Sequence, residues 1–152
     1  MLLLPGLYTA IAMLSPVLRA NGHGHLGGIV FSLYRGWCHQ FPQRTIFLEG
    51  FPMAICARCF ALGAGVVLGA LLAGRVSDLT RAPRKLKLPF AGMIVLALPM
   101  FLDGFTQLLG FRESTNTLRV ATGGLFGVAV AFWVVPTLYD AFDELRGNES
   151  HG

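Results

Sequence analysis

The chain has 152 residues, of which 54% are hydrophobic and only 13% are charged, and its formal net charge is +4. An ordinary soluble domain carries about 25% charged residues, so this composition argues against a water-soluble class and predicts a protein of the lipid bilayer. The sequence contains no Walker or dinucleotide-binding fingerprint and no Ser/His/Asp set with recognisable spacing. No nucleic-acid partner is expected.

Four stretches predict transmembrane helices, because a span needs about 20 mostly apolar residues. They cover about residues 1–19, 56–75, 88–110 and 116–138, and residues 20–55 form a loop between the first two. The first stretch lacks the basic start of a signal peptide, which favours an uncleaved helix. The expected fold is therefore an all-α membrane protein, a single domain over residues 1–152 with four transmembrane helices and a cysteine-containing loop capping one membrane face.

The loop at residues 20–55, here named the cap, is irregular in pattern. It begins with a glycine-rich linker at residues 21–28 and a short predicted helix at 29–37, and the pairs Phe41-Pro42 and Phe51-Pro52 interrupt the remainder of the segment. Residues 38–55 are therefore predicted to be a loop with a turn at Glu49-Gly50. The many apolar side chains of this segment favour a re-entrant or interfacial position against the helix ends.

All three cysteines lie in or beside the cap. Cys38 is followed directly by His39, and Cys56 and Cys59 form a C-x-x-C motif. Zinc and related thiophilic metals take four nitrogen or sulfur ligands in a tetrahedron, and C-x-x-C supplies two thiolates at a suitable spacing. The pattern predicts a zinc or similar metal site formed by Cys38, His39, Cys56 and Cys59. A disulfide between Cys56 and Cys59 is the alternative.

A second set of polar residues surrounds the third and fourth predicted spans. Asp103 and Gln107 are four residues apart and share one helical face. A charge inside a span is costly, so Asp103 is either a clamp that pairs with Arg119 or Arg58, or part of a functional site. We favour the site, in which Asp103 acts as a catalytic base.

The same site is expected to include a polar or substrate-binding pocket. Ser114 is predicted to be the N-cap of the last helix, whose first turn carries two more polar residues of the set. The pocket residues are Arg44, Arg58, Gln107, Arg112, Ser114, Asn116 and Arg119.

The remaining patterns concern packing and orientation. Small residues recur every four positions in the second span and in the fourth, which predicts close helix contact: Ala61, Gly65 and Gly69, and Gly123, Gly127 and Ala131. The basic connection at residues 75–87 is cytoplasmic by the positive-inside rule. The cysteine motifs and the turn at 110–115 are then predicted on the non-cytoplasmic face, and the polar tail at 140–152 is expected to be frayed.

Three segments together resemble a known family. They are Cys38-His-Gln, Cys56-Ala-Arg-Cys and the stretch from Asp103 to Gly123. They are similar to a family of small predicted membrane proteins, the domain of unknown function numbered two thousand and eighty-five, over roughly residues 34–132. Thr45 stands where the family usually has serine, and Phe60-Ala61 where it tends to have a small polar residue and glycine. The resemblance implies a small membrane protein and no particular activity.

Three functions are compatible with these patterns. The first is a metal-binding membrane protein, with the metal activating water and the arginines binding an anionic or lipid substrate in a hydrolase. The second is a membrane thiol-disulfide oxidoreductase that uses Cys56 and Cys59. The third is a non-enzymatic structural or assembly protein. A relay of thiols usually requires two pairs of cysteines, whereas this chain has one pair and a third cysteine beside a histidine. This pattern is more typical of a set of metal ligands, so the metal-binding protein is preferred.

Overall fold

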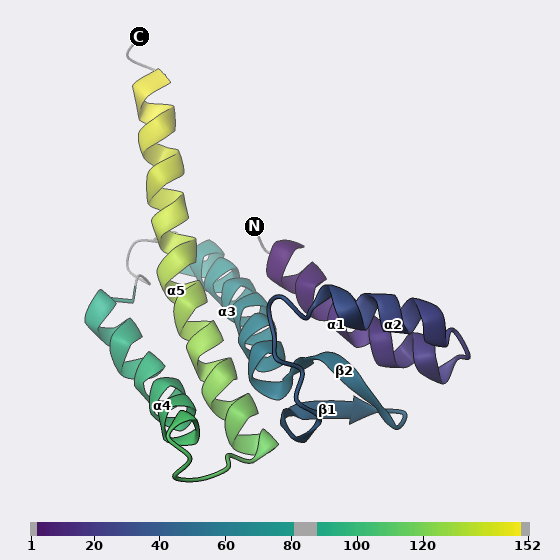
Figure 1. Cartoon of the computed structure of the whole chain (residues 1–152). Helices are drawn as coiled ribbons and strands as arrows, with labels where there is room; N and C mark the ends of the chain where they lie inside the picture. Colours follow the sequence, from purple (N-terminus) through teal and green to yellow (C-terminus); the bar gives the residue numbers. More distant parts are fainter. Residues whose placement is uncertain (1–2, 81–87, 150–152) are drawn as a thin grey trace.

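The computed structural model describes residues 3–80 and 88–149, and most of them are helical (Figure 1). The elements are α1 (Leu3–Ala20), α2 (Gly24–Leu33), the short 3-10 turn η1 (Pro42–Arg44), β1 (Thr45–Leu48), β2 (Phe51–Cys56), α3 (Ala57–Thr80), α4 (Phe90–Leu108) and α5 (Asn116–Glu149). The prediction of a mainly helical protein is confirmed. A small two-stranded sheet is also present, which the sequence did not predict.

Among the described residues, three helices are long and apolar enough to cross a membrane. They are Ala57–Arg75 of α3, the whole of α4, and Asn116–Ala141 of α5. The predicted count of four spans is not confirmed, because α1 is not among them. The helices α1 and α2 lie side by side (Figure 1), and α1 packs against α3. The Ser15 hydroxyl joins the α1–α2 pair by donating to the Gly27 carbonyl at 2.9 Å.

The closest helix pair is α3 with α5, as the small-residue pattern predicted. A Cβ atom added at Gly65 would lie 2.5 Å from the Gly124 carbonyl oxygen, and one added at Gly127 would collide with the Leu62 carbonyl oxygen. The two backbones can approach this closely only because both helices present small residues at the contact. This pair is the rigid support on which the cap and α4 are placed.

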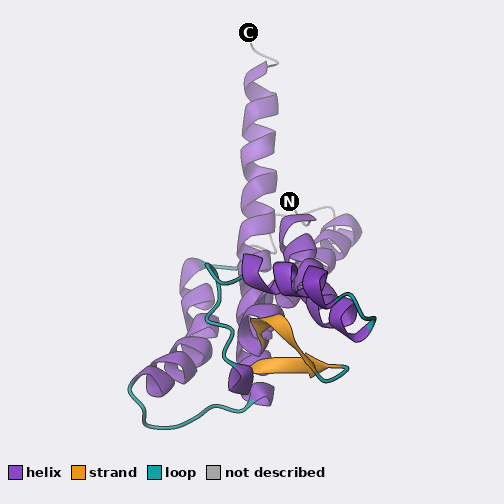
Figure 2. Ribbon diagram, turned by 45° about the vertical axis from the view of Figure 1, so that its right-hand side comes forward, coloured by secondary structure: helices purple, strands orange, loops and turns teal. Residues whose placement is uncertain are grey.

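The cap contains a β-hairpin where a loop was predicted. β1 and β2 pair antiparallel with Leu48 opposite Phe51, and the predicted turn at Glu49-Gly50 is present with positive φ at both residues, 51° and 80°. This is the backbone of a tight hairpin turn, and the β-branched and aromatic residues around it favour strands. Figure 2 shows the hairpin below the α1–α2 pair, next to the beginning of α5.

Several predicted boundaries are wrong. α2 begins at Gly24, so the second half of the predicted glycine-rich linker is helical. α5 continues to Glu149, so most of the predicted frayed tail is helix, which its Ala, Leu, Glu and Arg residues favour. Residues 81–87, which carry most of the basic loop, lie outside the described residues, and the orientation in the membrane stays a prediction.

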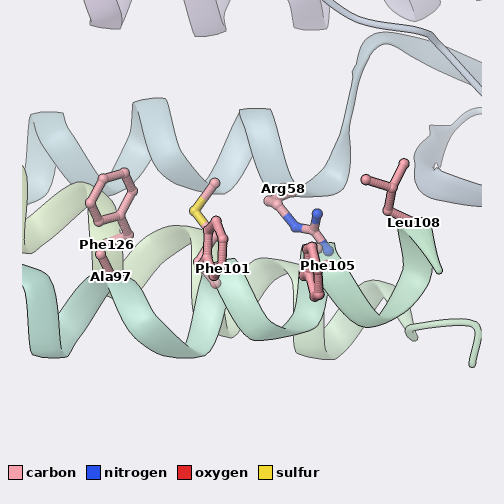
Figure 3. A pocket seen from close by; sticks show the side chains of 8 residues that line it. Arg58, Ala97, Phe101, Phe105, Leu108 and Phe126 are labelled. Atoms are coloured by element: carbon pink, nitrogen blue, oxygen red, sulfur yellow. The ribbon is translucent and has the colours of Figure 1, made fainter. Parts of the chain in front are cut away.

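Helix α4 is the least enclosed of the three candidate spans. It packs against α5, while a cavity of about 410 Å³ separates it from the first turns of α3 (Figure 3). Only 6% of α4 is buried within the protein, against 39% for the span of α3. One side of α4 therefore faces a space that the polypeptide does not fill.

The α3–α5 contact predicts a sharp difference between two glycines of the same helix. Gly65→Ala should destabilise the protein by about 1 to 3 kcal/mol, because the added methyl group meets backbone. Gly74→Ala, at which nothing lies within 4 Å of the new Cβ, should be neutral or slightly stabilising. Thermal unfolding in detergent micelles measures both. Equal midpoints for the two variants would contradict the close contact.

Candidate functional site

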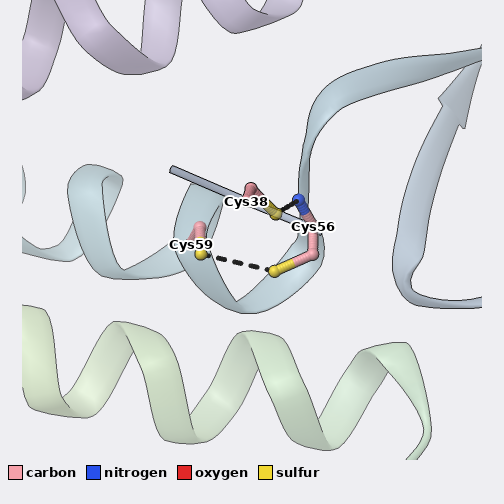
Figure 4. A group of neighbouring side chains, drawn as sticks. All are labelled: Cys38, Cys56 and Cys59. Atoms are coloured by element: carbon pink, nitrogen blue, oxygen red, sulfur yellow. Dashed lines mark hydrogen bonds between the residues drawn. The ribbon is translucent and has the colours of Figure 1, made fainter. Parts of the chain in front are cut away.

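The three cysteines meet where β2 passes into α3 (Figure 4). Their Sγ atoms all lie within 4.8 Å of one another, with 3.4 Å between those of Cys56 and Cys59, and the Cys56 N–H donates to the Cys38 sulfur at 3.2 Å. In a tetrahedral site with metal–sulfur bonds of about 2.3 Å, neighbouring sulfurs are about 3.8 Å apart. The three thiols are therefore close enough together to be candidate ligands of a single ion.

The local sequence explains this convergence. Cys56 ends β2 and Cys59 lies in the first turn of α3, so C-x-x-C straddles a strand-to-helix junction. Cys38 reaches the same point because its N–H donates to the Tyr34 carbonyl at 3.0 Å and the following loop is fixed to β2. Gln40 provides that attachment: its side chain donates to the Ala54 carbonyl at 2.8 Å, and its positive φ of 51° turns the chain.

The thiols differ in acidity. Hydrogen bonds from the Cys56 thiol, and then from the Cys59 thiol, lower the pKa of the buried Cys38 well below its ordinary value. The interaction with Cys38 raises the pKa of the Cys56 thiol. Cys38 is therefore the thiol of these two that more readily carries the negative charge needed for metal binding.

His39 is not brought into the cysteine group. Its ring is exposed and stacks on Phe41, with 5.9 Å between the ring centroids, and the Arg44 guanidinium lies 5.3 Å from the centre of the same Phe41 ring. These side chains form a wall of the site. The structure thus places three of the four predicted ligands together and the fourth beside them.

Asp103 is the centre of a buried ionic network. Its side chain is only 2% exposed and pairs with Arg58 of α3 and with Arg112, the latter at 2.9 Å. Gln107 also donates to the carboxylate, at 3.1 Å. Of the two clamp partners considered from the sequence, Arg58 is in direct contact and Arg119 is not. Both carboxylate oxygens are thus engaged by cations.

Arg119 joins this network to the cap through neutral groups. It is 4% exposed, and its guanidinium donates to the Gln107 side chain at 3.1 Å, to the Asn116 side chain at 2.9 Å and to the Gln43 carbonyl at 3.2 Å. No carboxylate of the described residues lies within ion-pair distance of it, and its Nε has no hydrogen-bond partner there. Arg119 is a buried cation whose charge is not neutralised by a direct contact.

The beginning of α5 differs from the prediction. The N-cap is Thr115, whose hydroxyl accepts from the Leu118 N–H at 3.3 Å, and not Ser114, whose hydroxyl is turned to the Thr115 carbonyl. Asn116 donates to the Thr45 carbonyl of β1 at 3.0 Å. The first turn of α5 is therefore fixed to the hairpin, and Ser114 is a buried neighbour of the site.

A single pocket of about 200 Å³, here named the polar pocket, connects the two groups of residues. Its walls are formed by residues 37–41 of the cap, Cys56 and Cys59, the three arginines Arg44, Arg58 and Arg119, and Gln107. The thiols and the guanidinium groups thus face the same space. Four residues of the predicted set do not line the pocket: Asp103, Arg112, Ser114 and Asn116. Asp103 and Asn116 contact residues that do, namely Arg58 and Arg119.

The sequence patterns assigned no role to two residues that shape this pocket. Gln40 belongs to the Cys-His-Gln box, and its side chain is buried in the structure. Its position directly after two potential ligands was the sequence signal that could have indicated its role in holding the loop. Gln43 contributes only its backbone carbonyl, to Arg119. Every residue has a backbone carbonyl, so the residue type at position 43 could not indicate this contact.

A family model described as a predicted membrane protein, DUF2085, matches residues 38–133, and the chain belongs to this family. An uncharacterized protein of Methanocaldococcus jannaschii is 39% identical over 112 residues, covering 73% of this chain and 69% of the relative. An uncharacterized protein of Methanothermobacter thermautotrophicus is 36% identical over 98 residues, covering 64% of this chain and 84% of the relative. No solved structure matches the chain.

The ionic network predicts graded effects on stability. Asp103→Asn should cost about 3 to 5 kcal/mol, because it leaves the largely buried Arg58 without its counter-ion. Arg112→Gln, which alters a half-exposed partner of the same carboxylate, should cost about 1 kcal/mol or less.

A double-mutant cycle separates the contacts within this network. Asp103→Asn should couple strongly with Arg58→Gln and weakly with Arg119→Gln, because only Arg58 touches the carboxylate. Unfolding in mixed micelles gives all the required free energies. Stronger coupling of Asp103 to Arg119 than to Arg58 would show that the pairing described here is wrong.

Proposed function

We propose that the protein is a membrane-embedded metal protein in which Cys38, Cys56 and Cys59 hold zinc or a similar thiophilic ion beside a pocket for an anionic group. The observation that carries the proposal is the convergence of all three thiols, whose Sγ atoms lie within 4.8 Å of one another. The N–H···S hydrogen bond to Cys38 supports it, because such bonds stabilise thiolate ligands. His39, a water molecule or the anionic ligand would complete the coordination.

The charges around the polar pocket support an anionic ligand. Three arginines line it, Arg44, Arg58 and Arg119, and the neighbouring carboxylate of Asp103 is already engaged by two guanidinium groups. Burying the Arg119 charge among neutral acceptors is costly, and a bound anion would reduce that cost. Phosphate and carboxylate groups are the anions that guanidinium groups bind best.

A hydrolase acting on an anionic substrate is the activity that suits this arrangement best. The metal would supply an activated water molecule, and the arginines would hold the substrate. Asp103 does not line the pocket, and cations engage both of its oxygens. We therefore assign to Asp103 the role of positioning Arg58, in place of the base expected from the sequence.

The orientation remains part of the proposal. The basic residues at 75–87 favour a cytoplasmic position for that connection, which would put the cysteines on the non-cytoplasmic face. The hydrogen bond from Asn116, which directly follows the turn at 110–115, to the Thr45 carbonyl of the cap supports the expectation that the turn and the cap lie on the same side.

Metal binding predicts a stoichiometry and a pattern of losses. The purified full chain should carry one thiophilic metal ion, and Cys38→Ser, Cys56→Ser and Cys59→Ser should each abolish it, because a site with three thiolates does not survive the loss of one. His39→Ala should reduce metal content less than any cysteine variant, with His25→Ala as the matched control that leaves it unchanged. Elemental analysis beside a free-thiol count measures this.

The same two measurements distinguish the competing functions. One metal ion and no disulfide supports the metal protein. No metal and a disulfide between Cys56 and Cys59 overturns it in favour of the thiol-disulfide oxidoreductase. No metal and three free thiols overturns it in favour of the structural protein.

The anion pocket predicts charge-specific binding of inorganic phosphate. Arg44→Gln should weaken phosphate binding about tenfold, because Arg44 lines the pocket. The variant should still fold, because the Arg44 side chain is exposed. Arg35→Gln removes the same charge from an exposed residue outside the pocket and serves as the control. Titration calorimetry in micelles measures both affinities. Equal affinities for the two variants would exclude the pocket as the phosphate site.

A further inference from the structure

The second cavity of the site region lies along the candidate membrane span α4. It is named the apolar groove, and it follows one face of α4 with the helical spacing of Ala97, Met100, Phe101, Gly104, Phe105 and Leu108. Phe126 of α5 and Arg58 of α3 complete its lining. In Figure 3 the apolar side chains lie in the space between α3 and α4, and the Arg58 guanidinium points into it beside Phe105.

Arg58 connects this groove to the polar pocket, because it lines both. Its Nε is buried and has no hydrogen-bond partner among the described residues, although its Nη2 pairs with Asp103. A mostly buried cation therefore lies between an apolar groove and a pocket of further cations. This juxtaposition matches a molecule with an anionic head and an apolar tail.

The dimensions of the groove favour a hydrocarbon chain over a helix as its occupant. From Ala97 to Leu108 the rise along α4 is about 16 Å, which is about half the thickness of the hydrocarbon core and so corresponds to one leaflet. The cavity of about 410 Å³ is several times smaller than a helix of this length, which has a diameter of about 10 Å and occupies about 1,300 Å³.

We infer that the groove holds the single hydrocarbon chain of a lipid-type amphiphile whose anionic head lies against Arg58 and enters the polar pocket. The chain lies along α4 in the leaflet next to the cysteines and enters sideways between α3 and α4. This inference rests on the proposed function, in which the polar pocket binds an anionic group. It defines the substrate class as an anionic lipid. The groove supplies affinity for the tail, and the arginines select the charge of the head.

The test uses a photoactivatable hexadecyl phosphate with a diazirine near the end of its chain, added to the full-length protein in detergent micelles. The probe should label residues 88–112, and it should do so about tenfold more than the diazirine hexadecanol, which has the same tail and no charge. Mass spectrometry of the proteolysed protein locates the label. Labelling that does not depend on the charge of the head shows general lipid contact only and overturns the inference.

Two matched variants test the groove itself. Ala97→Phe fills it and should lower labelling about tenfold, whereas Ala91→Phe, on an exposed position of the same helix outside the groove, should leave labelling unchanged. Equal labelling of the two variants overturns the inference. Inorganic phosphate should compete far less well than unlabelled hexadecyl phosphate, and equal competition would mean that a free anion is the ligand and the groove contributes nothing.

Metal content and native mass, measured on the same samples, separate this inference from the proposed function. Selective labelling of a protein without metal supports the groove and overturns the metal site alone. A metal-loaded protein that is labelled unselectively overturns the groove alone. A dimer that Ala97→Phe dissociates, in a protein that the probe does not label, assigns the groove to a second copy of the chain and overturns the inference.

Discussion

The carboxylate of Asp103 is the interaction on which the site depends. It lies inside a candidate transmembrane helix, where an isolated charge is expensive, and it is stable there because guanidinium groups and an amide from three directions engage its oxygens. Those partners belong to the first turn of α3, the end of α4 and the α4–α5 turn. One buried charge thus fixes the relative positions of α3 and α4 at the end of the bundle that carries the cap.

The cap is positioned by the same network. Gln107 contacts both Asp103 and Arg119, Arg119 reaches the Gln43 carbonyl, and Asn116 reaches the Thr45 carbonyl at the start of the hairpin. The hairpin ends at Cys56, so the position of the thiols depends on contacts made by the first turn of α5. The close α3–α5 pair gives these contacts a rigid base, because its helices meet through glycine and alanine. One connected set of contacts therefore positions both the cysteines and the arginines.

The sequence indicated which residues lie near one another better than it indicated the contacts between them. The spacing of C-x-x-C, the nearby Cys38 and the i, i+4 pair Asp103 and Gln107 are local patterns, and local patterns carry direct geometric meaning. The partner of Asp103 is a question of tertiary geometry, and spacing alone could not choose between Arg58 and Arg119. Arg58 was available as a choice only because it lies within the C-x-x-C motif.

For the fold as well, local sequence patterns indicated some features, and others depended on tertiary contacts. The small-residue ridge of α3 and α5 was visible because it repeats every four residues. The hairpin was not, because Pro52 and the apolar run around it resemble an irregular loop, and only pairing with Thr45 and Phe47 shows the strand. The first apolar stretch has the composition of a span, and its contacts with α2 and α3 depend on tertiary packing, which hydropathy does not predict.

The central proposal is that Cys38, Cys56 and Cys59 bind a thiophilic metal beside the arginines of the polar pocket. X-ray absorption at the K-edge of the metal in the purified full-length protein tests this claim most directly, because it reports the ligand atoms themselves. Metal binding by the three cysteines predicts three sulfur scatterers at about 2.3 Å and one lighter scatterer in the remaining position. A shell of oxygen and nitrogen alone would show that the metal is not bound by the cysteines and would contradict the account.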